Sequence, residues 1–261
     1  MQQVYSSDNR EMMLYITIAC SGKKQFRVWA EQLGKPNSKY AERQIEVENS
    51  RVIHFNFPVS PKDLYIGCVN INNPKDTDFT VTIVEEPLKK YNIWLDEETR
   101  DFFQLAINFS QVCGFKKPAK DGTVYQTKDA HFNIKYFPVI KDFATGAMLS
   151  TPARIGHRTG IIETSAIKFV KYTIPMRVMI LAHEFSHKYK NPKIDLKISN
   201  EVGADINALY IYLGLGFSKI DAICVFANVF LKAQTDENII RMRKILDYID
   251  RFENQEYAQI T

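Results

Sequence analysis

The stretch Leu181-Ala182-His183-Glu184-Phe185-Ser186-His187 contains the pattern H-E-x-x-H inside a segment whose apolar residues have helical spacing. Residues four apart in a helix lie one above the other on the same face. Both imidazoles can therefore point at one ion, with Glu184 beside them to act on a metal-activated water. The stretch predicts a helix that carries a catalytic metal, and such a metal needs a third protein ligand.

The sequence offers three sources for that third ligand. The extended pattern H-E-x-x-H-x-x-G-x-x-H is excluded, because Lys190 and Lys193 stand where it requires glycine and histidine. Three other histidines are each less typical of a ligand: His54 favours a structural or surface role, and His131 and His157 favour a surface role or a role that supports the ligands without binding the metal. The remaining source is a carboxylate on the next predicted helix, where Glu201 is well placed and Asp205 follows one turn later.

Glu201 and Asp205 can have complementary roles at a metal site. Glu201 would complete a His-His-Glu ligand set with His183 and His187. Asp205 could accept a hydrogen bond from the second ring nitrogen of a ligand histidine, which would fix the tautomer and orientation of that ring.

The two stretches His183-Glu184-Phe185-Ser186-His187 and Glu201-Val202-Gly203-Ala204-Asp205 together resemble the gluzincin branch of the zincin metallopeptidases. The second stretch has the form E-x-x-A-D, similar to compact members that process prenylated proteins or cleave repressors. The resemblance covers roughly residues 92–230 and implies a zincin fold, with a small sheet, an active-site helix and a helical lower part. It also implies that residues 160–164 form the edge strand that lines the cleft and pairs with an extended substrate.

The activity expected from this site is zinc-dependent hydrolysis of a peptide bond in a protein or peptide substrate. Zn²⁺ would be held by His183, His187 and Glu201. Glu184 would take a proton from the metal-activated water and pass it to the leaving amine. A further donor should stabilise the oxyanion or deliver a proton, and four candidates stay unranked: Tyr210, Tyr212, His157 and Arg154.

The residues before the motif follow a different pattern. Five segments are rich in β-forming residues and alternate with turn signals: 13–18, 26–30, 51–57, 63–71 and 79–84. Short strands without a helical pattern predict an antiparallel β-sandwich-like domain over residues 1–88, with a docking or assembly role. The polar, proline-containing segment 85–90 is the expected boundary.

Helical and strand patterns alternate after that boundary. We expect a helix between an N-cap at Asp96 and a stop at Gly114, followed by strands at 123–126, 132–137 and 160–164. Four more helices are expected, with starts indicated by Pro175, Ser199, Ser218 and Thr235. The fold class is therefore α+β, with a second, zincin-like domain over residues 91–261 and a helical C-terminal part.

Composition narrows the functional classes. The 261 residues are 45% hydrophobic and carry a formal charge of only +4, which makes nucleic acid an unlikely partner. The four cysteines form no C-x-x-C pair, which excludes a zinc ribbon and does not support a disulfide framework. No signal peptide and no membrane span are visible, so we expect a cytoplasmic protein.

A second class of function fits the same features. The β-rich first domain, with no secretion signal or pro-segment visible, also suits a structural or assembly protein, for example a component of a virus or phage particle. The metal would then be structural, or the activity vestigial. Residues 1–88 would provide the contact with an assembly partner.

Overall fold

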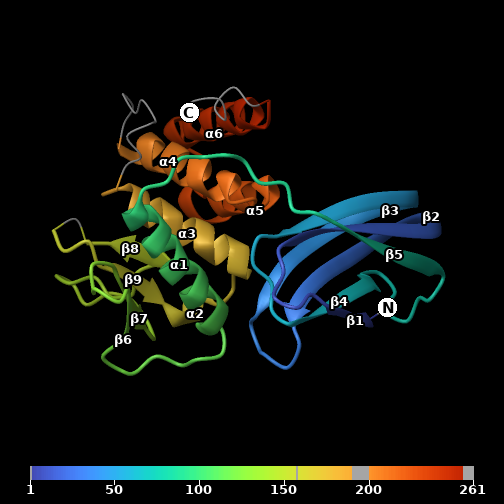
Figure 1. Ribbon diagram of the computed structural model, residues 1–261, viewed down its shortest axis with the longest axis horizontal. Helices are drawn as coiled ribbons and strands as arrows, with labels where there is room; N and C mark the ends of the chain where they lie inside the picture. The colour runs from blue at the N-terminus through green and yellow to red at the C-terminus, as the bar shows by residue number, and fades with distance from the viewer. Residues whose placement is uncertain (1, 157, 190–199, 255–261) are drawn as a thin grey trace. The chain divides into compact units, whose positions relative to one another are not determined.

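The computed structural model describes residues 2–156, 158–189 and 200–254 (Figure 1). The chain divides into two compact units. The first contains the residues up to Lys89 together with Gly216–Ser218, and the second contains the remainder. The predicted α+β class is confirmed, because the structure combines helices with two sheets of largely antiparallel strands.

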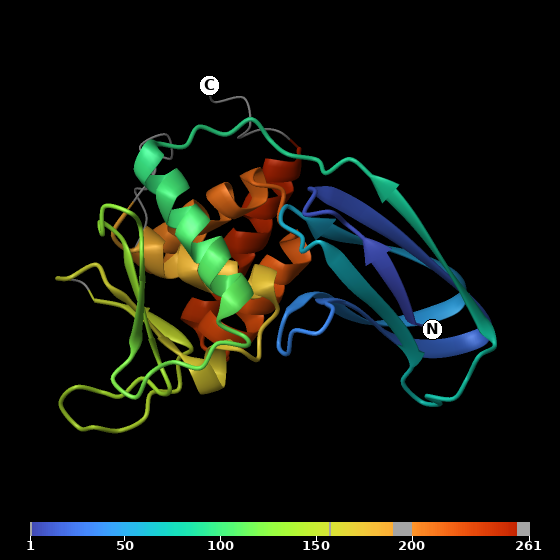
Figure 2. The same cartoon turned by 60° about the horizontal axis from the view of Figure 1, so that its bottom comes forward.

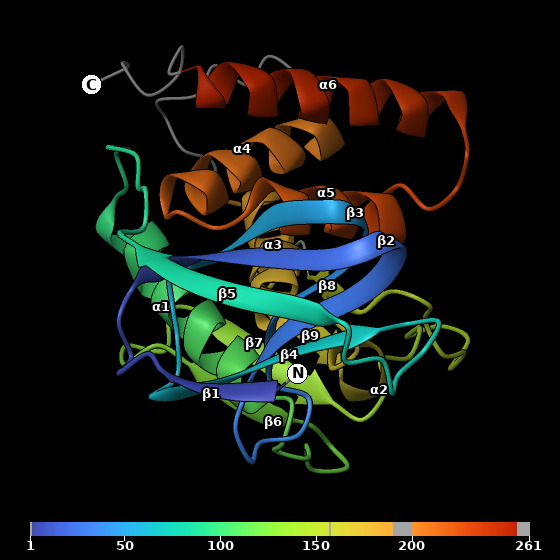
Figure 3. The same ribbon diagram turned by 90° about the vertical axis from the view of Figure 1, so that its right-hand side faces the viewer.

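The first unit is a five-stranded antiparallel sheet built around two long strands, β2 (Met12–Gln32) and β3 (Lys39–Phe57). The first half of β2 pairs with β5 (Phe79–Glu86), as Figure 3 shows, and its second half pairs with β4 (Asp63–Asn70). Strand β1 (Gln2–Ser6) adds to β4. Apolar side chains alternate with polar ones along β2, so one face of the sheet carries the core.

The strand limits in this unit differ from the prediction. Strand β1 was not expected, β3 begins at Lys39 and not at residue 51, and two predicted segments belong to one strand. Segments 13–18 and 26–30 are two halves of β2 and not separate strands. The expected turn between them is an irregularity where the register with β3 shifts between Ala19 and Lys23, and Gly22 has φ +70° there. A bulge of this kind bends a strand without ending it, which is why its glycine resembles a turn signal in the sequence.

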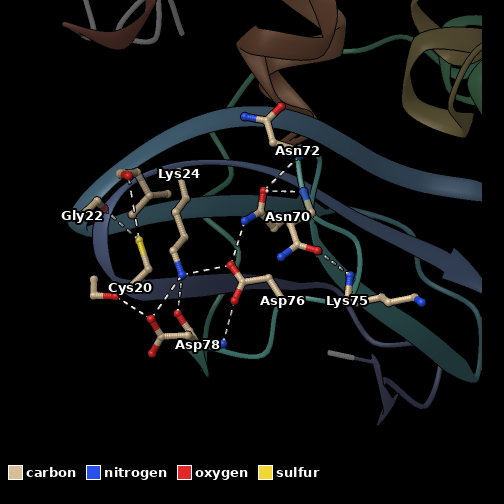
Figure 4. Close-up of polar contacts among 11 residues, drawn as sticks. Cys20, Gly22, Lys24, Asn70, Asn72, Lys75, Asp76 and Asp78 are labelled. Atoms are coloured by element: carbon tan, nitrogen blue, oxygen red, sulfur yellow. Dashed lines mark hydrogen bonds and ion pairs between the residues drawn. The ribbon is translucent and has the colours of Figure 1, made fainter.

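A polar cluster fixes the loop between β4 and β5 onto β2 (Figure 4). The Lys24 ammonium lies 2.9 Å from Asp76 Oδ2 and 3.4 Å from Asp78 Oδ2. Asp76 also accepts hydrogen bonds from Asn70 Nδ2 at 2.7 Å and from Asp78 N at 2.9 Å. The hydrogen bond from Lys24 is the largest cause that lowers the pKa of Asp76 to about 2, so this carboxylate stays ionised well into acid.

The second unit contains a four-stranded sheet in the order β6 (Thr123–Gln126), β7 (Asn133–Phe137), β9 (Ile162–Ser165), β8 (Ala153–Ile155). Strands β7 and β9 are parallel and the other pairs are antiparallel. Because β9 has a neighbour on each side, the prediction that residues 160–164 form the edge strand is wrong. The two edge strands are β6 and β8, and β8, the neighbour of β9, has three residues and is too short to give a periodic signal in the sequence.

The helices of this unit are α1 (Glu97–Val112), α2 (Ala166–Phe169), α3 (Ile174–Ser186), α4 (Asn200–Gly214), α5 (Lys219–Val225), the π-helical turn η1 (Phe226–Phe230) and α6 (Asp236–Glu253). The predicted N-caps Asp96 and Thr235 are confirmed, since their side chains accept from Thr99 N at 2.7 Å and Asn238 N at 3.2 Å. The predicted cap Ser199 lies outside the described residues. Within those residues, no helix combines the length and apolar character that crossing a bilayer requires.

Helix α3 is the central element of the second unit (Figure 2). It contacts α1, α4 and α5 and also packs on strands β8 and β9. Its first half is held by Arg177, which is fully buried and donates to Ser110 O and Val170 O, both at 2.9 Å. These carbonyls lie at the ends of α1 and α2, where the helix dipole favours a cation. Both flanking elements are thereby fixed to the helix that carries the H-E-x-x-H pattern.

Candidate metal centre

The two histidines of the pattern meet at the C-terminal end of α3. His183 lies in its last turn and His187 is its C-cap residue. Their Nε2 atoms are 3.1 Å apart and their rings are nearly perpendicular. His183 is 2% exposed. Two imidazole nitrogens that face each other at this distance, one buried, form a site suited to a shared metal ion.

Glu201 approaches the same point from the first turn of α4. Its Oε1 is 3.8 Å from His187 Nε2, and its Oε2 is 3.8 Å from His183 Nε2. One ligand atom from each of the three residues lies within 4.8 Å of the others. Ligands placed tetrahedrally at about 2.0–2.1 Å from a metal ion are about 3.3–3.4 Å apart, and the separations of 3.1 Å and 3.8 Å seen here are close to that value.

Asp205 supports the inner histidine. It is fully buried, and its Oδ1 lies 2.9 Å from His183 Nδ1. The ring N–H is not aimed closely enough at this oxygen to form a regular hydrogen bond, so the contact is mainly electrostatic. A carboxylate in this position favours the proton on Nδ1 and leaves the lone pair of Nε2 available to a metal.

Arg241 of α6 completes the polar shell, and sequence reasoning missed it. Its guanidinium donates to both oxygens of Asp205, at 2.8–3.0 Å, and lies 3.1 Å from Glu201 Oε2. Arg241 is 7% exposed. The feature that distinguishes Arg241 is its burial on an amphipathic helix. Burial of a single arginine cannot be inferred from one sequence.

Aromatic packing limits the movement of the histidine-bearing helix. The ring of Phe230, in η1, lies against His183 with 3.9 Å between centroids. Phe185 stacks on Phe102 of α1 at 4.1 Å. Asn207 Nδ2 donates to Ser186 Oγ at 2.7 Å and to Tyr189 O at 3.0 Å, which fastens the end of α3 to α4. π-Helical turns such as η1 occur often at functional sites.

Glu184 follows His183 directly in α3 and is 7% exposed. Its carboxylate is therefore largely shielded from solvent, and partial burial of this kind is a condition that can tune the pKa of a general base.

Of the four candidate oxyanion or proton donors, three lie in the described residues, and each of these has a partner outside the metal cluster. The Tyr210 hydroxyl accepts from Trp94 N at 3.2 Å, and burial raises the pKa of this phenol. The Tyr212 hydroxyl donates to Pro175 O, near the opposite end of α3. Arg154 pairs with Glu163 at 2.7 Å, and both side chains lie on the half-buried face of β8 and β9. The buried residues of these strands alternate with them and face the helices. His157 lies outside the described residues.

The other two described histidines have partners outside the cluster. His54 belongs to β3 in the first unit, where its ring packs beside Tyr15. His131 is exposed and lies 3.8 Å from Glu98. Among the described residues, His183, His187 and Glu201 are the group able to hold a metal ion.

Comparison of the chain with protein-family models, with curated proteins and with solved structures gave no match. The functional assignment therefore depends on the geometry of the cluster itself.

Proposed function

We propose that this protein is a zinc-dependent metallopeptidase of the gluzincin type, acting on a protein or peptide substrate. The observation that carries the proposal is the approach of His183, His187 and Glu201 to one point from two separate helices. Asp205 beside the inner histidine adds the outer support that metal-binding imidazoles usually have.

The ligand set favours zinc. Two imidazole nitrogens and one carboxylate oxygen make up the His₂Glu set of catalytic zinc sites, which keep the fourth position open for water or substrate. The half-exposed Glu201 side chain leaves access from solvent on one side. When bound, zinc supplies Lewis acidity that lowers the pKa of water to about 7 and polarises a carbonyl group.

The chain's own residues supply the proton transfers. The Glu184 carboxylate accepts a proton from the attacking water and donates it to the departing amine nitrogen. Asp205 and Arg241 hold His183 and Glu201 in place during these steps. Strand β8 pairs with β9 on one side only within the described residues, so its other edge is the place where an extended substrate would add as a strand.

The test pairs Glu184→Gln with a matched exposed control, Glu98→Gln. Both variants and the parent protein are loaded with zinc, and cleavage of a peptide library is followed by mass spectrometry. We expect Glu184→Gln to keep its zinc and lose about 10²–10⁴-fold in rate, while Glu98→Gln is unchanged. Full activity of Glu184→Gln would contradict the mechanism.

We also propose a fold type for each of the two units. We assign the second unit to the zincin type, because its metal-carrying helix α3 lies between a small sheet and a group of C-terminal helices. We assign the first unit to the β-sandwich type, because the irregularity in β2 between Ala19 and Lys23 allows the two ends of one sheet to face each other.

A second candidate function is favoured by one observation in the first unit. Strand β3 has 19 residues and, in the described part of the chain, pairs with β2 alone. A long edge strand is a template for pairing with another chain, as an assembly protein of a virus or phage particle requires. Recovery of the protein at fixed stoichiometry in a large particle would favour this function, whereas catalytic amounts in the cytoplasm would favour the peptidase.

A further inference from the structure

We infer that Arg241 is a positioning residue of the metal centre and that it sets the metal affinity by holding Glu201 and Asp205 together. The inference rests on the proposed function, because it concerns the same ligands. It adds a residue from α6 to a centre that the two sequence stretches place on α3 and α4 alone.

The contacts of Arg241 join the ligand to its support. Its terminal nitrogen Nη2 lies 2.8 Å from Asp205 Oδ2 and 3.1 Å from Glu201 Oε2. Its Nε donates to the same Asp205 oxygen at 3.0 Å. A planar guanidinium can donate to two carboxylates at once in this way. The single ammonium of a lysine lacks the paired, coplanar N–H donors that this geometry requires.

The charge balance explains why a cation is needed at this point. Glu201 and Asp205 are four residues apart on α4, so their carboxylates lie on the same face and repel each other. Asp205 is fully buried and Glu201 is 48% exposed. Without Arg241, Glu201 gains by rotating toward water, and its oxygens then leave the two imidazoles.

The position of Arg241 also makes the metal centre dependent on α6. This helix starts at the Thr235 cap and buries Ile245, Ile249 and Phe252 in the second unit. Arg241 lies on the same buried side, 36 residues after Asp205. Packing of α6 therefore delivers the guanidinium, and changes that loosen α6 should weaken metal binding without altering any ligand.

The test uses the full chain with Arg241→Met, Arg241→Lys and the control Arg243→Met, an exposed arginine on the same helix. Zn²⁺ and Co²⁺ affinities are measured by competition with a chromophoric chelator, below the unfolding temperature of every variant. The Co²⁺ absorption spectrum reports the ligand geometry. We expect Arg241→Met to bind about 10–100-fold more weakly with an altered spectrum, Arg241→Lys to lie between, and Arg243→Met to match the parent.

The possible results distinguish the role of Arg241 from the existence of the metal centre. A folded Arg241→Met variant with parental affinity and spectrum would overturn the role of Arg241 and leave the metal centre intact. A parent protein that binds neither ion would remove the proposed function as well. If Arg241→Met does not fold, Arg241→Lys decides, because parental affinity in that variant would also overturn the inference.

Discussion

Replacing Asp205 by asparagine tests how far the buried carboxylate supports the second unit. The substitution Asp205→Asn keeps the shape of the side chain but removes its charge. The carboxylate accepts three hydrogen bonds from Arg241 and lies 2.9 Å from His183 Nδ1. An amide can offer only one oxygen to these donors, and its NH₂ group would face the guanidinium.

The size of the effect follows from burial. Asp205 is fully buried and Arg241 is 7% exposed, so the substitution leaves the buried guanidinium with only the half-exposed Glu201 carboxylate, 3.1 Å away, as a counter-charge. Breaking such a pair costs about 3–5 kcal/mol, and the similar shape of asparagine favours the lower end, about 3 kcal/mol. Each kcal/mol shifts the unfolding midpoint of a unit of this size by about 2–4 °C, so we expect a fall of about 6–12 °C.

The assay is thermal unfolding of the metal-free protein, followed by circular dichroism, with zinc affinity measured on the same samples below the transition. Asp247→Asn is the matched control, because Asp247 is a largely exposed acid on α6. We expect zinc affinity to fall about 10–100-fold in Asp205→Asn and to stay unchanged in the control. A midpoint within about 1 °C of the parent, together with unchanged affinity, would refute the reasoning.

Three further predictions concern stability. The folded pKa of Asp76, about 2, lies below its ordinary value of 3.8, so its stabilisation is complete above about pH 4 and is lost as the pH falls toward 2. The unfolding midpoint of the parent should therefore drop more steeply across this range than that of Asp76→Asn, and parallel curves would contradict this. A Cβ at Gly67 would overlap the indole ring of Trp29, so Gly67→Ala should cost about 1–3 kcal/mol in urea unfolding monitored by tryptophan fluorescence. An unchanged urea midpoint would show that the ring moves freely. Arg177→Ala removes the guanidinium donor from two carbonyls and leaves a cavity, so it should lower the unfolding free energy by about 3–5 kcal/mol, whereas a loss under about 1 kcal/mol would contradict its role in fixing α3.

Features of the site that depend on local spacing could be predicted from the sequence. The four-residue interval between His183 and His187 needs only a helix to place both rings together, and the caps Asp96 and Thr235 act within one turn. Glu201 was within reach of prediction because only a short stretch of sequence separates it from His187.

Features that depend on tertiary packing could not be predicted in this way. Arg241 meets Asp205 across 36 residues, and no periodic pattern links the two positions. Strand β8 owes its place to pairing with β9 and not to its own three residues. Gly22 gives the same signal in a bulge as in a turn, so the continuity of β2 becomes visible only in the paired sheet.

The central claim is that His183, His187 and Glu201 bind one zinc ion, and metal analysis of reconstituted protein tests it most directly. The parent, His187→Ala and the exposed control His131→Ala are loaded with Zn²⁺, freed of excess ion and analysed for zinc per chain. We predict about one zinc per chain in the parent and in His131→Ala, and a large loss in His187→Ala. Absence of zinc from the parent, or equal zinc in all three proteins, would contradict the account.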